Sequence, residues 1–513
     1  MWRRVYFLLV VLRIYFALSP SYLHPDENFQ GPEVIAGEVF NYPVHHTWEF
    51  TSDYPIRSTF PLWLIYGLPM LILRSIWEGL GREVPPRVVY WTLRLLMFTL
   101  SFVLEDWALQ ELVHSPRKRR VAIMLVASSY VTWTYQSHTF SNAVETLVVL
   151  WSLVLIQRVV EDKEHSGAFA CAVLAFLVTL GIFNRITFPA YIVVPASQLL
   201  PHFRRKPVAL LSIVIFGLLT AVSAVLMDTA FYRRDTPLFA TALKAPIVTP
   251  FNNLLYNVAT SNLAQHGLHP IYQHAAVNLP QLLGPAYLLI FANCFYTSTR
   301  LVGAVFGTLI LSIFPHQEAR FLLPAVPLIL SSLKLPKHGT KFFFSVWVVF
   351  NLIFGTLMGT YHQGGVVPMQ LHIGAMDGVK HVFWWKSYSP PLWLLDGKID
   401  SMKTTDLMGM QKESMMQELS GVIHCKAKDR SGVFLVAPYS AVYLDRFVVG
   451  ESGEMKLSKA PPEKGELYLR ERWRYNQHLN LDDLDFADDG VLPTLSRVIG
   501  RRGLVLWEVQ VDC

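Results

Sequence analysis

Two polar clusters carry the residue types that acid–base and phosphate chemistry need. The first follows the earliest apolar segment directly, as HPDENFQ from residue 24 to residue 30. Carboxylates there can accept a proton from a reacting hydroxyl, and the neighbouring imidazole and amide groups can bind a substrate. The candidates are Asp26 and Glu27 as catalytic carboxylates and His24 and Gln30 as substrate ligands.

Adjacent carboxylates on a helix point about 100° apart, so Asp26 and Glu27 are not expected to act on the same atom. One can serve as a base while the other holds the loop. Pro25 and Pro32 suit the first positions of helices, and the acids after them suit a first turn. We therefore expect two short helices at the membrane surface, the second being PEVIAGEVF. A purely structural helix start would explain the acids equally well.

The second cluster, PHQEARFLLP from residue 315 to residue 324, lies between two apolar segments. Ionisable residues at such a depth are costly and usually mark function. Arg320 is suited to bind a phosphate, although an ion pair with Glu318 would explain both residues without a ligand. The candidate substrate ligands here are His316, Gln317, Glu318 and Arg320.

Smaller polar groups lie at the ends of other apolar segments. Each alone is typical of a helix cap or of a side chain that reaches from the apolar zone toward water. Their predicted position on one common side makes them candidate substrate ligands as well: Asn142, Glu145, Arg185, His362 and Gln363.

The composition excludes a soluble protein of this size. Of 513 residues, 52% are hydrophobic and only 16% are charged, and the mean hydropathy is +0.34. The chain is predicted to be an α-helical polytopic membrane protein, with about ten to twelve transmembrane helices in a domain over residues 1–370. The net charge of +6 comes from short basic clusters between apolar segments, which indicates orientation signals and no nucleic-acid partner.

The basic clusters orient the predicted segments, because short loops rich in Lys and Arg stay in the cytosol. The first lumenal loop is then 19–58, a large lumenal loop spans 228–281, and the candidate residues fall on the lumenal side. One conflict remains at Arg117 to Arg120. Two full spans between residues 59 and 112 would carry this cluster to the lumen, so either one stretch does not cross or the cluster breaks the rule.

Both ends of the chain carry signals of their own. Arg13 interrupts the first apolar run, which favours an uncleaved membrane helix over a signal peptide. Residues 386–513 are predicted to form a small soluble lumenal α+β domain. Its expected strands are GVFLVAP (432–438), SAVYL (440–444), GELYLRERW (465–473) and GLVLWEVQV (503–511).

No metal site is predicted from ligand spacing. His266, His269 and His274 have no carboxylate beside them. The acidic run at 481–490 lacks the glycine and terminal glutamate positions of an EF-hand. We expect that run to be a solvated turn or a contact with the membrane domain.

The four cysteines show no CxxC spacing. Cys171 and Cys294 lie in apolar segments and are expected to be packing residues. Cys425 and Cys513 share the polar C-terminal part and would be able to pair if that part is lumenal.

Taken in order, these motifs resemble those of one family, the polytopic endoplasmic-reticulum mannosyltransferases of GT-C architecture that use dolichyl-phosphate-mannose. The resemblance covers most of residues 1–370 and rests on HPDENFQ, the stretch from Ser137 to Glu145, HQEARFLLP and YHQGGVVP. Within the family, HPDE-x-FQ followed by PEVIAG and HQEARFLLP is most similar to members that add the fourth mannose of the glycosylphosphatidylinositol (GPI) precursor, in α1,2 linkage to the third. Members that add the third mannose, or that extend the lipid-linked oligosaccharide, are the alternative.

The resemblance implies an inverting transfer at the endoplasmic-reticulum membrane, with the active site on the lumenal face. The donor sugar is β-linked and the product α-linked, so one displacement with one base is expected. Asp26 matches the catalytic acidic residue of the family, with Glu27 in reserve. The resemblance also implies that positive charge stabilises the leaving phosphate; the candidates, in falling order, are Arg320, His316, Arg185 and His362.

The implied partners are dolichyl-phosphate-mannose, the GPI precursor and the lipid bilayer, and the sequence identifies no protein partner. No cofactor is indicated; a divalent cation is an open alternative, although the DxD motif at Asp483 to Asp485 does not match the site of the family. A transporter or flippase is the rival from a different class. That rival predicts inverted repeats and charges near mid-membrane, whereas we find no repeat and the polar clusters lie at segment ends.

Overall fold

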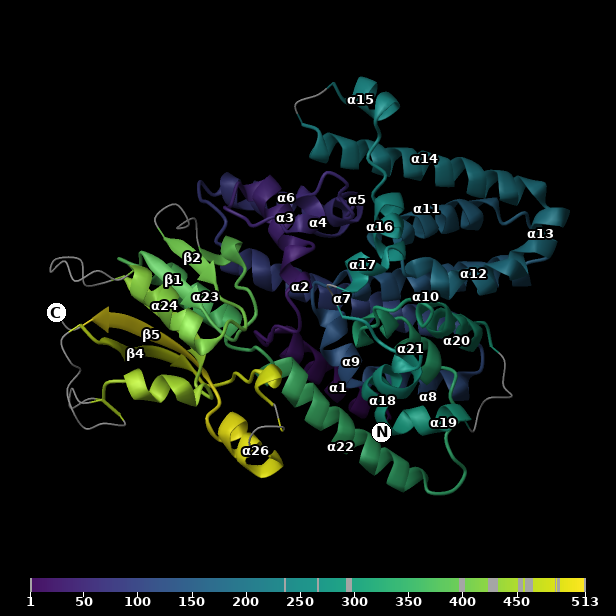
Figure 1. Cartoon of the computed structure of the whole chain (residues 1–513). Coiled ribbons are helices and arrows are strands. Elements are labelled where there is room, and N and C mark those ends of the chain that lie inside the picture. The colour runs from purple at the N-terminus through teal and green to yellow at the C-terminus, as the bar shows by residue number, and fades with distance from the viewer. Residues whose placement is uncertain are drawn as a thin grey trace.

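The computed structural model describes residues 2–234, 237–264, 267–291, 298–395, 402–422, 432–450, 455–456, 465–484, 486 and 490–511. Figure 1 shows a large helical part and, beside it, a smaller part that holds the strands. The expected α-helical protein with a small C-terminal α+β part is confirmed.

Long helices run between two ends of the helical part, and shorter helices connect them. The long ones are α1 (Trp2–Ala17), α7 (Pro86–Leu112), α10 (Ser141–Glu161), α11 (Ala168–Asn184), α14 (Pro207–Tyr232), α20 (Thr299–Leu311) and α22 (Thr340–Thr356). The shorter ones are α2 (Asp26–Phe29), α3 (Pro32–Phe40), α4 (Trp48–Thr51), α5 (Phe60–Leu62), α6 (Leu68–Gly79), α8 (Pro116–Ala127), α9 (Tyr130–Trp133), α12 (Phe188–Ala196), α13 (Leu200–Arg205), α15 (Leu238–Lys244), α16 (Thr249–Val258), α17 (Thr260–Leu263), α18 (Leu279–Leu283), α19 (Leu288–Phe291), α21 (Ala325–Leu330) and α23 (Val366–Ala375).

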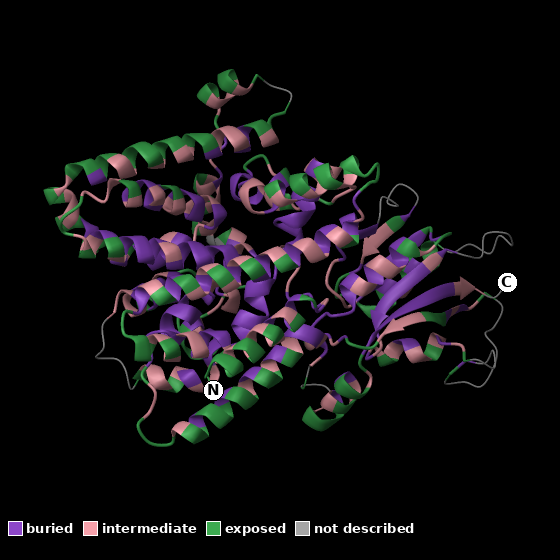
Figure 2. Cartoon of the chain, turned by 180° about the vertical axis from the view of Figure 1, so that it is seen from behind, coloured by how far each residue is buried: buried purple, intermediate pink, exposed green. Residues whose placement is uncertain are grey.

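Apolar helices face outward over much of the helical part. Within the described ranges, five helical segments are long and apolar enough to cross a bilayer by length and composition, and α11 and α20 are shorter apolar helices. Figure 2 shows α14 and α22 exposed at the outside, whereas α10 lies inside and is mostly buried. An outward apolar face of this extent is what lipid would cover.

The first helix is an integral part of this bundle. Arg13 of α1 forms a buried ion pair with Glu105 of α7 at 3.2 Å. Arg94 of α7 is also buried, and it donates hydrogen bonds to the carbonyl oxygens of Phe16, Ala17 and Ser19. Carbonyl groups at the end of a helix have no partner within the helix, so this guanidinium caps α1. Arg13 is therefore explained by packing within the bundle.

The segment from Phe60 to Gly79 contacts the first-loop end of the bundle near both of its own ends. It begins beside Asp228, at the last turns of α14. After α6, the carbonyl oxygen of Val84 accepts a hydrogen bond from Tyr42, which lies just past α3. Figure 1 shows α6 beside α3, and Arg74 of α6 donates to the carbonyl oxygen of Val39 at 2.9 Å. Both ends of the segment thus lie with the first loop.

This arrangement bears on the conflict at Arg117 to Arg120. Helix α7 runs from the first-loop end to the opposite end, where Arg119 of α8 donates to the carbonyl oxygen of Gln110. The basic residues of α13 lie before the start of α14, at the end of that helix opposite to Asp228. Of the two alternatives that the sequence left open, this path of the chain favours the one in which one stretch does not cross.

The first loop contains the two short helices predicted for it. Helix α2 begins at Asp26 directly after Pro25, and α3 begins at Pro32 with Glu33 in its first turn. Asn41 ends α3 in the left-handed conformation, which short polar side chains tolerate. Glu27, Asn28 and Phe29 of α2 are buried, whereas Asp26 is not.

The C-terminal part is built on one mixed sheet of five strands in the order β2-β1-β3-β5-β4. Strand β1 pairs in parallel with β2 and β3, and β5 pairs antiparallel with β3 and β4. The strands are β1 (His381–Trp384), β2 (Lys403–Asp406), β3 (Val433–Pro438), β4 (Leu467–Tyr475) and β5 (Leu504–Val511), and the helices of this part are α24 (Lys412–Val422) and α26 (Val491–Gly500).

Helices cover both faces of this sheet. Leu435 of β3 packs with Met415 and Leu419 of α24, whereas Phe434 packs with Val366 and other residues of α23. Side chains alternate along a strand, so β3 is buried on both faces and its sequence is apolar throughout. Because α23 follows α22 directly, it joins the sheet to the helical part.

The strand predictions were partly wrong. The strands expected at 432–438, 465–473 and 503–511 are confirmed, with shifted bounds. The stretch at 440–444 is not a strand, because Val442–Phe447 forms a 3₁₀ helix. Strands β1 and β2 were not predicted, since four residues each give too short a pattern.

Two further expectations concern cysteines and the acidic run. Cys171 is a buried packing residue, as expected, while the other three cysteines lie outside the described residues. Asp483 is buried, contrary to a solvated turn, and it accepts hydrogen bonds from Lys386 at 3.3 Å and Ser440 at 2.9 Å. Both partners belong to the C-terminal part, so Asp483 does not contact the membrane domain through them.

Asp228 ties three segments together at the first-loop end. One carboxylate oxygen accepts hydrogen bonds from the hydroxyl of Ser58 at 3.0 Å and from the amide and hydroxyl groups of Thr59 at 2.8 and 3.1 Å. The other oxygen accepts from the hydroxyl of Thr249 at 2.8 Å. The end of the first loop and the start of α16 are thereby fixed to α14.

Replacing Asp228 with Ala should destabilise this end of the protein. Buried donors on Ser58, Thr59 and Thr249 would lose their acceptor, at a cost of about 2–4 kcal/mol. We expect a clear fall in the apparent unfolding temperature of the detergent-solubilised protein. Asp53→Ala, on the exposed part of the same loop, is the matched control, and equal unfolding temperatures for the two variants would contradict the role of Asp228.

Candidate active site

A polar cavity of about 440 Å³ opens at the first-loop end of the helical part. Four separate segments line it: the first loop, the turn after α11, helices α16 and α17, and the stretch from His316 into η7 (Ala319–Leu322). Seven of the residues predicted from sequence meet here: His24, Asp26, Gln30, Arg185, His316, Glu318 and Arg320.

Arg320 lies at the centre of this group. Its guanidinium forms ion pairs with Asp26 and with Glu318, and its Nη2 donates to Glu318 Oε1 at 3.1 Å. The same Glu318 oxygen lies 2.9 Å from His316 Nε2. The side chain of Arg320 is only 11% exposed, so charges from distant parts of the sequence meet in a confined space.

Asp26 is held in its charged form. Burial disfavours the carboxylate, but Arg320, His24 and Arg57 together outweigh it and keep the pKa of Asp26 well below its ordinary value. Gln30 donates to Asp26 Oδ2 at 2.6 Å, and His24 Nδ1 lies 3.3 Å from Asp26 Oδ1. Since the side chain of Asp26 is still 21% exposed, a molecule in the cavity can reach this carboxylate.

Glu318 shares this behaviour. Burial again disfavours its charge, and Arg320 and His316 lower the pKa of Glu318 strongly in spite of it. Burial alone would lower the pKa of His316, but the carboxylate of Glu318 raises it above the ordinary value. The cavity therefore has two ionised carboxylates, Asp26 and Glu318, around the guanidinium of Arg320. The raised pKa of His316 favours the protonated form of its imidazole.

Arg185 forms a second cationic group, held from behind by Glu145. Its Nε lies 3.4 Å from Glu145 Oε2, and its Nη1 donates to the hydroxyl of Ser141 at 2.9 Å. Thr187 donates to the other Glu145 oxygen at 2.5 Å. Both cations lie near the ring of Phe321. The guanidinium of Arg185 lies 5.3 Å from the ring centre and that of Arg320 lies 5.7 Å from it.

Glu27 points away from the cavity, as the angle between adjacent helical side chains predicts. It is 1% exposed and lies 2.5 Å from the Nδ1 atom of His138. Its backbone carbonyl oxygen accepts from Thr139 at 2.6 Å. Burial raises the pKa of Glu27 to about 8, with Arg94 offsetting only part of that effect, so Glu27 is largely protonated at neutral pH and anchors α2.

The remaining predicted residues lie outside the cavity lining. Asn142 and Glu145 are fully buried in α10, and Gln317 donates to the carbonyl oxygens of Ser312 and Phe314. His362 and Gln363 instead join the helical and C-terminal parts: His362 forms a β-bridge with Leu479, and Gln363 donates to Asn480.

The glycines of the YHQGG motif belong to that junction. A Cβ atom on Gly364 would collide with the backbone oxygen atoms of Thr360 and Gln477. Gln363 has a φ of 48°, in the left-handed region. The motif is thus explained by close packing of the C-terminal part on the end of α22.

Several cavity residues were not identified from sequence. Glu49 accepts hydrogen bonds from Gln30 at 3.0 Å and from Arg57 at 3.0 Å, so a third carboxylate joins the site through Gln30. Glu49 belongs to the predicted first lumenal loop, 19–58, but nothing in its spacing distinguished it from an ordinary loop residue. The others that line the cavity are Thr47, Trp48, Ile56, Arg57, Ile186, Thr187, Asn253, Tyr256, Asn257, Leu263 and Phe321.

An apolar cavity of about 270 Å³ adjoins the polar one. The two share lining residues on the turn after α11, on α16 and α17, and around η7: Ile186, Thr187, Asn257, Leu263, His316 and Phe321. Beyond these, apolar side chains of α12, α16 and α20 line it. A chain with a polar head and a hydrocarbon tail would fit across the two cavities.

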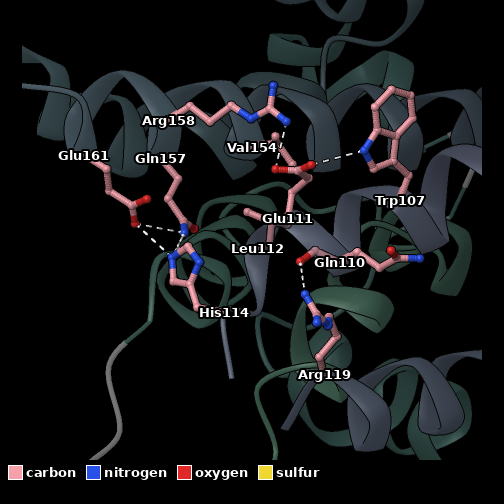
Figure 3. A pocket seen from close by; sticks show the side chains of 10 residues that line it. All are labelled: Trp107, Gln110, Glu111, Leu112, His114, Arg119, Val154, Gln157, Arg158 and Glu161. Atoms are coloured by element: carbon pink, nitrogen blue, oxygen red, sulfur yellow. Dashed lines mark hydrogen bonds and ion pairs between the residues drawn. The ribbon is translucent and has the colours of Figure 1, made fainter. Parts of the chain in front are cut away.

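A third cavity, of about 380 Å³, lies at the opposite end of the bundle (Figure 3). Four of its ionisable groups form two pairs: Arg158 pairs with Glu111 at 2.8 Å, and His114 lies 3.0 Å from Glu161. Helix α10 separates its lining residues from Ser141 by most of 21 residues, which is roughly 30 Å. None of the sequence-predicted site residues lines it.

The polar cavity is arranged around the guanidinium of Arg320, to which Asp26 and Glu318 both point. Within the described ranges, no group of three His, Cys, Asp or Glu side chains is suited to hold a metal. His274 instead hydrogen-bonds with Asn278 at 2.9 Å, and His266 lies outside the described residues.

Comparison with known proteins identifies the family. The model of the Alg9-like mannosyltransferase family matches residues 4–395. A GPI mannosyltransferase 4 from Aspergillus oryzae is 52% identical, with 99% of both chains covered, and one from Emericella nidulans is 48% identical, covering 99% of this chain and 98% of its own. Among solved structures, ArnT from Cupriavidus metallidurans bound to undecaprenyl phosphate is similar with a TM-score of 0.46 and 10% identity, covering 99% of this chain and 98% of its own. The chain belongs to the Alg9-like mannosyltransferase family.

Proposed function

We propose that this mannosyltransferase transfers mannose from dolichyl-phosphate-mannose, with inversion, to the third mannose of a GPI precursor in α1,2 linkage. The observation that carries the proposal is the meeting of Asp26 and Arg320 where the polar cavity adjoins the apolar one. The names of the relatives, GPI mannosyltransferase 4, support the acceptor class. The site would work on the lumenal face of the endoplasmic reticulum membrane.

Asp26 is the base in this scheme. Its carboxylate takes the proton from the 2-hydroxyl of the acceptor mannose while that oxygen forms a bond to the anomeric carbon of the donor. The bond between that carbon and the phosphate oxygen breaks in the same step, and the electron pair leaves with dolichyl phosphate. One displacement converts the β-linked donor into an α-linked product.

Arg320 binds the leaving phosphate, together with His316 and Arg185. A guanidinium fits phosphate geometry with two parallel hydrogen bonds and stabilises the charge that develops on departure. Drawing Arg320 toward phosphate would weaken its ion pair with Asp26. Asp26 would become more basic when the donor is bound, which is when a base is needed.

The apolar cavity takes the first isoprene units of the donor. Its lining by α12, α16 and α20 gives hydrocarbon a path from the bilayer to Phe321, where the polar cavity starts. The phosphate would then lie beside the cations and the sugar would extend toward Asp26. Lipid substrates explain why the site is at a membrane boundary.

The proposal is tested by transfer in microsomes supplied with dolichyl-phosphate-mannose and a three-mannose GPI precursor. We expect a four-mannose product whose new linkage is cleaved by an α1,2-specific mannosidase. Extension of a two-mannose precursor alone would show that the protein adds the third mannose. Absence of any transfer, with the protein present at normal abundance, would overturn the proposal.

Asp26→Asn should lower kcat by roughly 10²–10⁴-fold, since it removes the base. Glu27→Gln is the matched control, because Glu27 is largely protonated already and its amide replacement can still hydrogen-bond with His138. The initial rate of four-mannose product, normalised to protein abundance, separates the two. Equal losses in both variants would refute the assignment of Asp26.

Arg320→Gln should change the pH profile as well as the rate. Without the guanidinium, burial dominates and the pKa of Asp26 rises, so the acidic limb of kcat/KM moves to higher pH. The limb would be measured from about pH 5 to about pH 8, with kcat lowered by roughly 10²–10³-fold. Arg87→Gln, an exposed arginine at the start of α7, should leave the profile unchanged. If the acidic limb of Arg320→Gln is not shifted, the ionisation of Asp26 does not determine that limb.

A further inference from the structure

Two aromatic rings from different loops meet at one end of the polar cavity. Trp48 lies on α4 of the first loop and Tyr256 on α16, and both line the cavity. Their ring centres are 4.9 Å apart with a tilt of 33°. Trp48 is still 43% exposed, so a flat ligand can lie against it.

Charges at this aromatic end balance. Glu49 and Arg57 are its ionised residues, and they bind each other at 2.9 and 3.0 Å. The amide side chains of Asn253 and Asn257 on α16 also line this end. A ligand matched to this end is uncharged and rich in hydrogen-bonding groups.

Two polar atoms here have no hydrogen-bond partner among the described residues. They are Oε1 of Gln30 and Oγ1 of Thr47, and both are buried atoms of residues that line the cavity. A buried polar group without a partner is costly unless a ligand or water satisfies it. Hydroxyl groups of a bound molecule would supply the missing donors.

The other end of the cavity differs in each respect. Arg320, Arg185 and His316 gather there around Phe321, and the apolar cavity continues from it. Phosphate and hydrocarbon suit that end, whereas neutral hydroxyl-rich rings suit the aromatic end. Gln30 joins the two, since its amide donates both to Asp26 and to Glu49.

We infer that Trp48 and Tyr256 form the acceptor subsite, where the terminal mannose ring of the acceptor stacks on Trp48. The inference rests on the proposed function. One face of a pyranose presents C–H groups that pack on an indole ring, and its hydroxyl groups extend outward to Glu49, Gln30 and Asn257. The ring is then held on the Asp26 side of the cavity, with its attacking hydroxyl next to the base and away from the phosphate.

The fold keeps this subsite in place. Asn252 and Asn253 of α16 donate to the carbonyl oxygens of Pro55 and Ile56 at 3.0 and 3.2 Å. These bonds join α16 to the first loop just after α4. Trp48 and Tyr256 therefore keep their spacing although more than two hundred residues separate them, and a preformed platform loses little entropy on binding.

The test is a comparison of KM values for the two substrates. Trp48→Ala should raise the KM for the three-mannose GPI acceptor by roughly tenfold or more, the effect of truncating a large aromatic contact, and should leave the KM for dolichyl-phosphate-mannose unchanged. Trp48→Phe retains a ring and should fall between Trp48→Ala and wild type. Tyr54→Ala is the matched control, since Tyr54 lies on the same loop, is 78% exposed and does not line the cavity.

Each outcome bears on the subsite. An unchanged acceptor KM in Trp48→Ala, or a rise in the donor KM alone, would overturn the inference while the wild type still makes product. A wild type that makes no product would instead overturn the proposed function. Rates are normalised to folded protein, judged by the unfolding temperature, and Trp48→Phe carries the test if Trp48→Ala does not fold.

Discussion

The ion pair between Asp26 and Arg320 holds the site together, because it joins residues 294 positions apart. Charged groups taken out of water are expensive unless they are paired and hydrogen-bonded. Here the guanidinium of Arg320 forms ion pairs with both Asp26 and Glu318, and the imidazole of His316 contacts the carboxylate of Glu318. The rest of the first-loop end is built so that these two short segments, around Asp26 and around Arg320, can meet.

That requirement explains the buried polar contacts around the site. Arg94 caps α1 and fixes where the first loop begins, and Asp228 fixes where it ends. Between these two positions, the buried contact between the side chains of Glu27 and His138 fixes α2 to the interior of the helical part. A carboxylate placed to within a fraction of an ångström needs such supports, because the rate falls steeply when a reacting group is misplaced.

The sequence predicted the local features better than the distant ones. Proline followed by acids determined the starts of α2 and α3, because those preferences act within one turn of helix. Glu49 and Arg57 escaped notice, since their role arises only when the first loop folds back on Gln30. The position of Phe60–Gly79 beside the first loop could not be predicted either. Hydropathy measures composition, and by composition this segment is apolar enough to cross a bilayer. Tertiary contacts decided both cases.

Asp26 and Glu27 show how a fold can give neighbouring carboxylates opposite states. The helical turn sends one side chain to the cavity and the other to the interior. Cations in the cavity outweigh burial and keep Asp26 ionised, whereas burial dominates at Glu27 and raises its pKa to about 8. A protonated Glu27 can anchor α2 without placing a second negative charge next to Asp26, and of these two acids only Asp26 faces Arg320. Under the proposed function, one acid of the pair reacts and the other positions it, and the direction of two adjacent side chains sets the assignment.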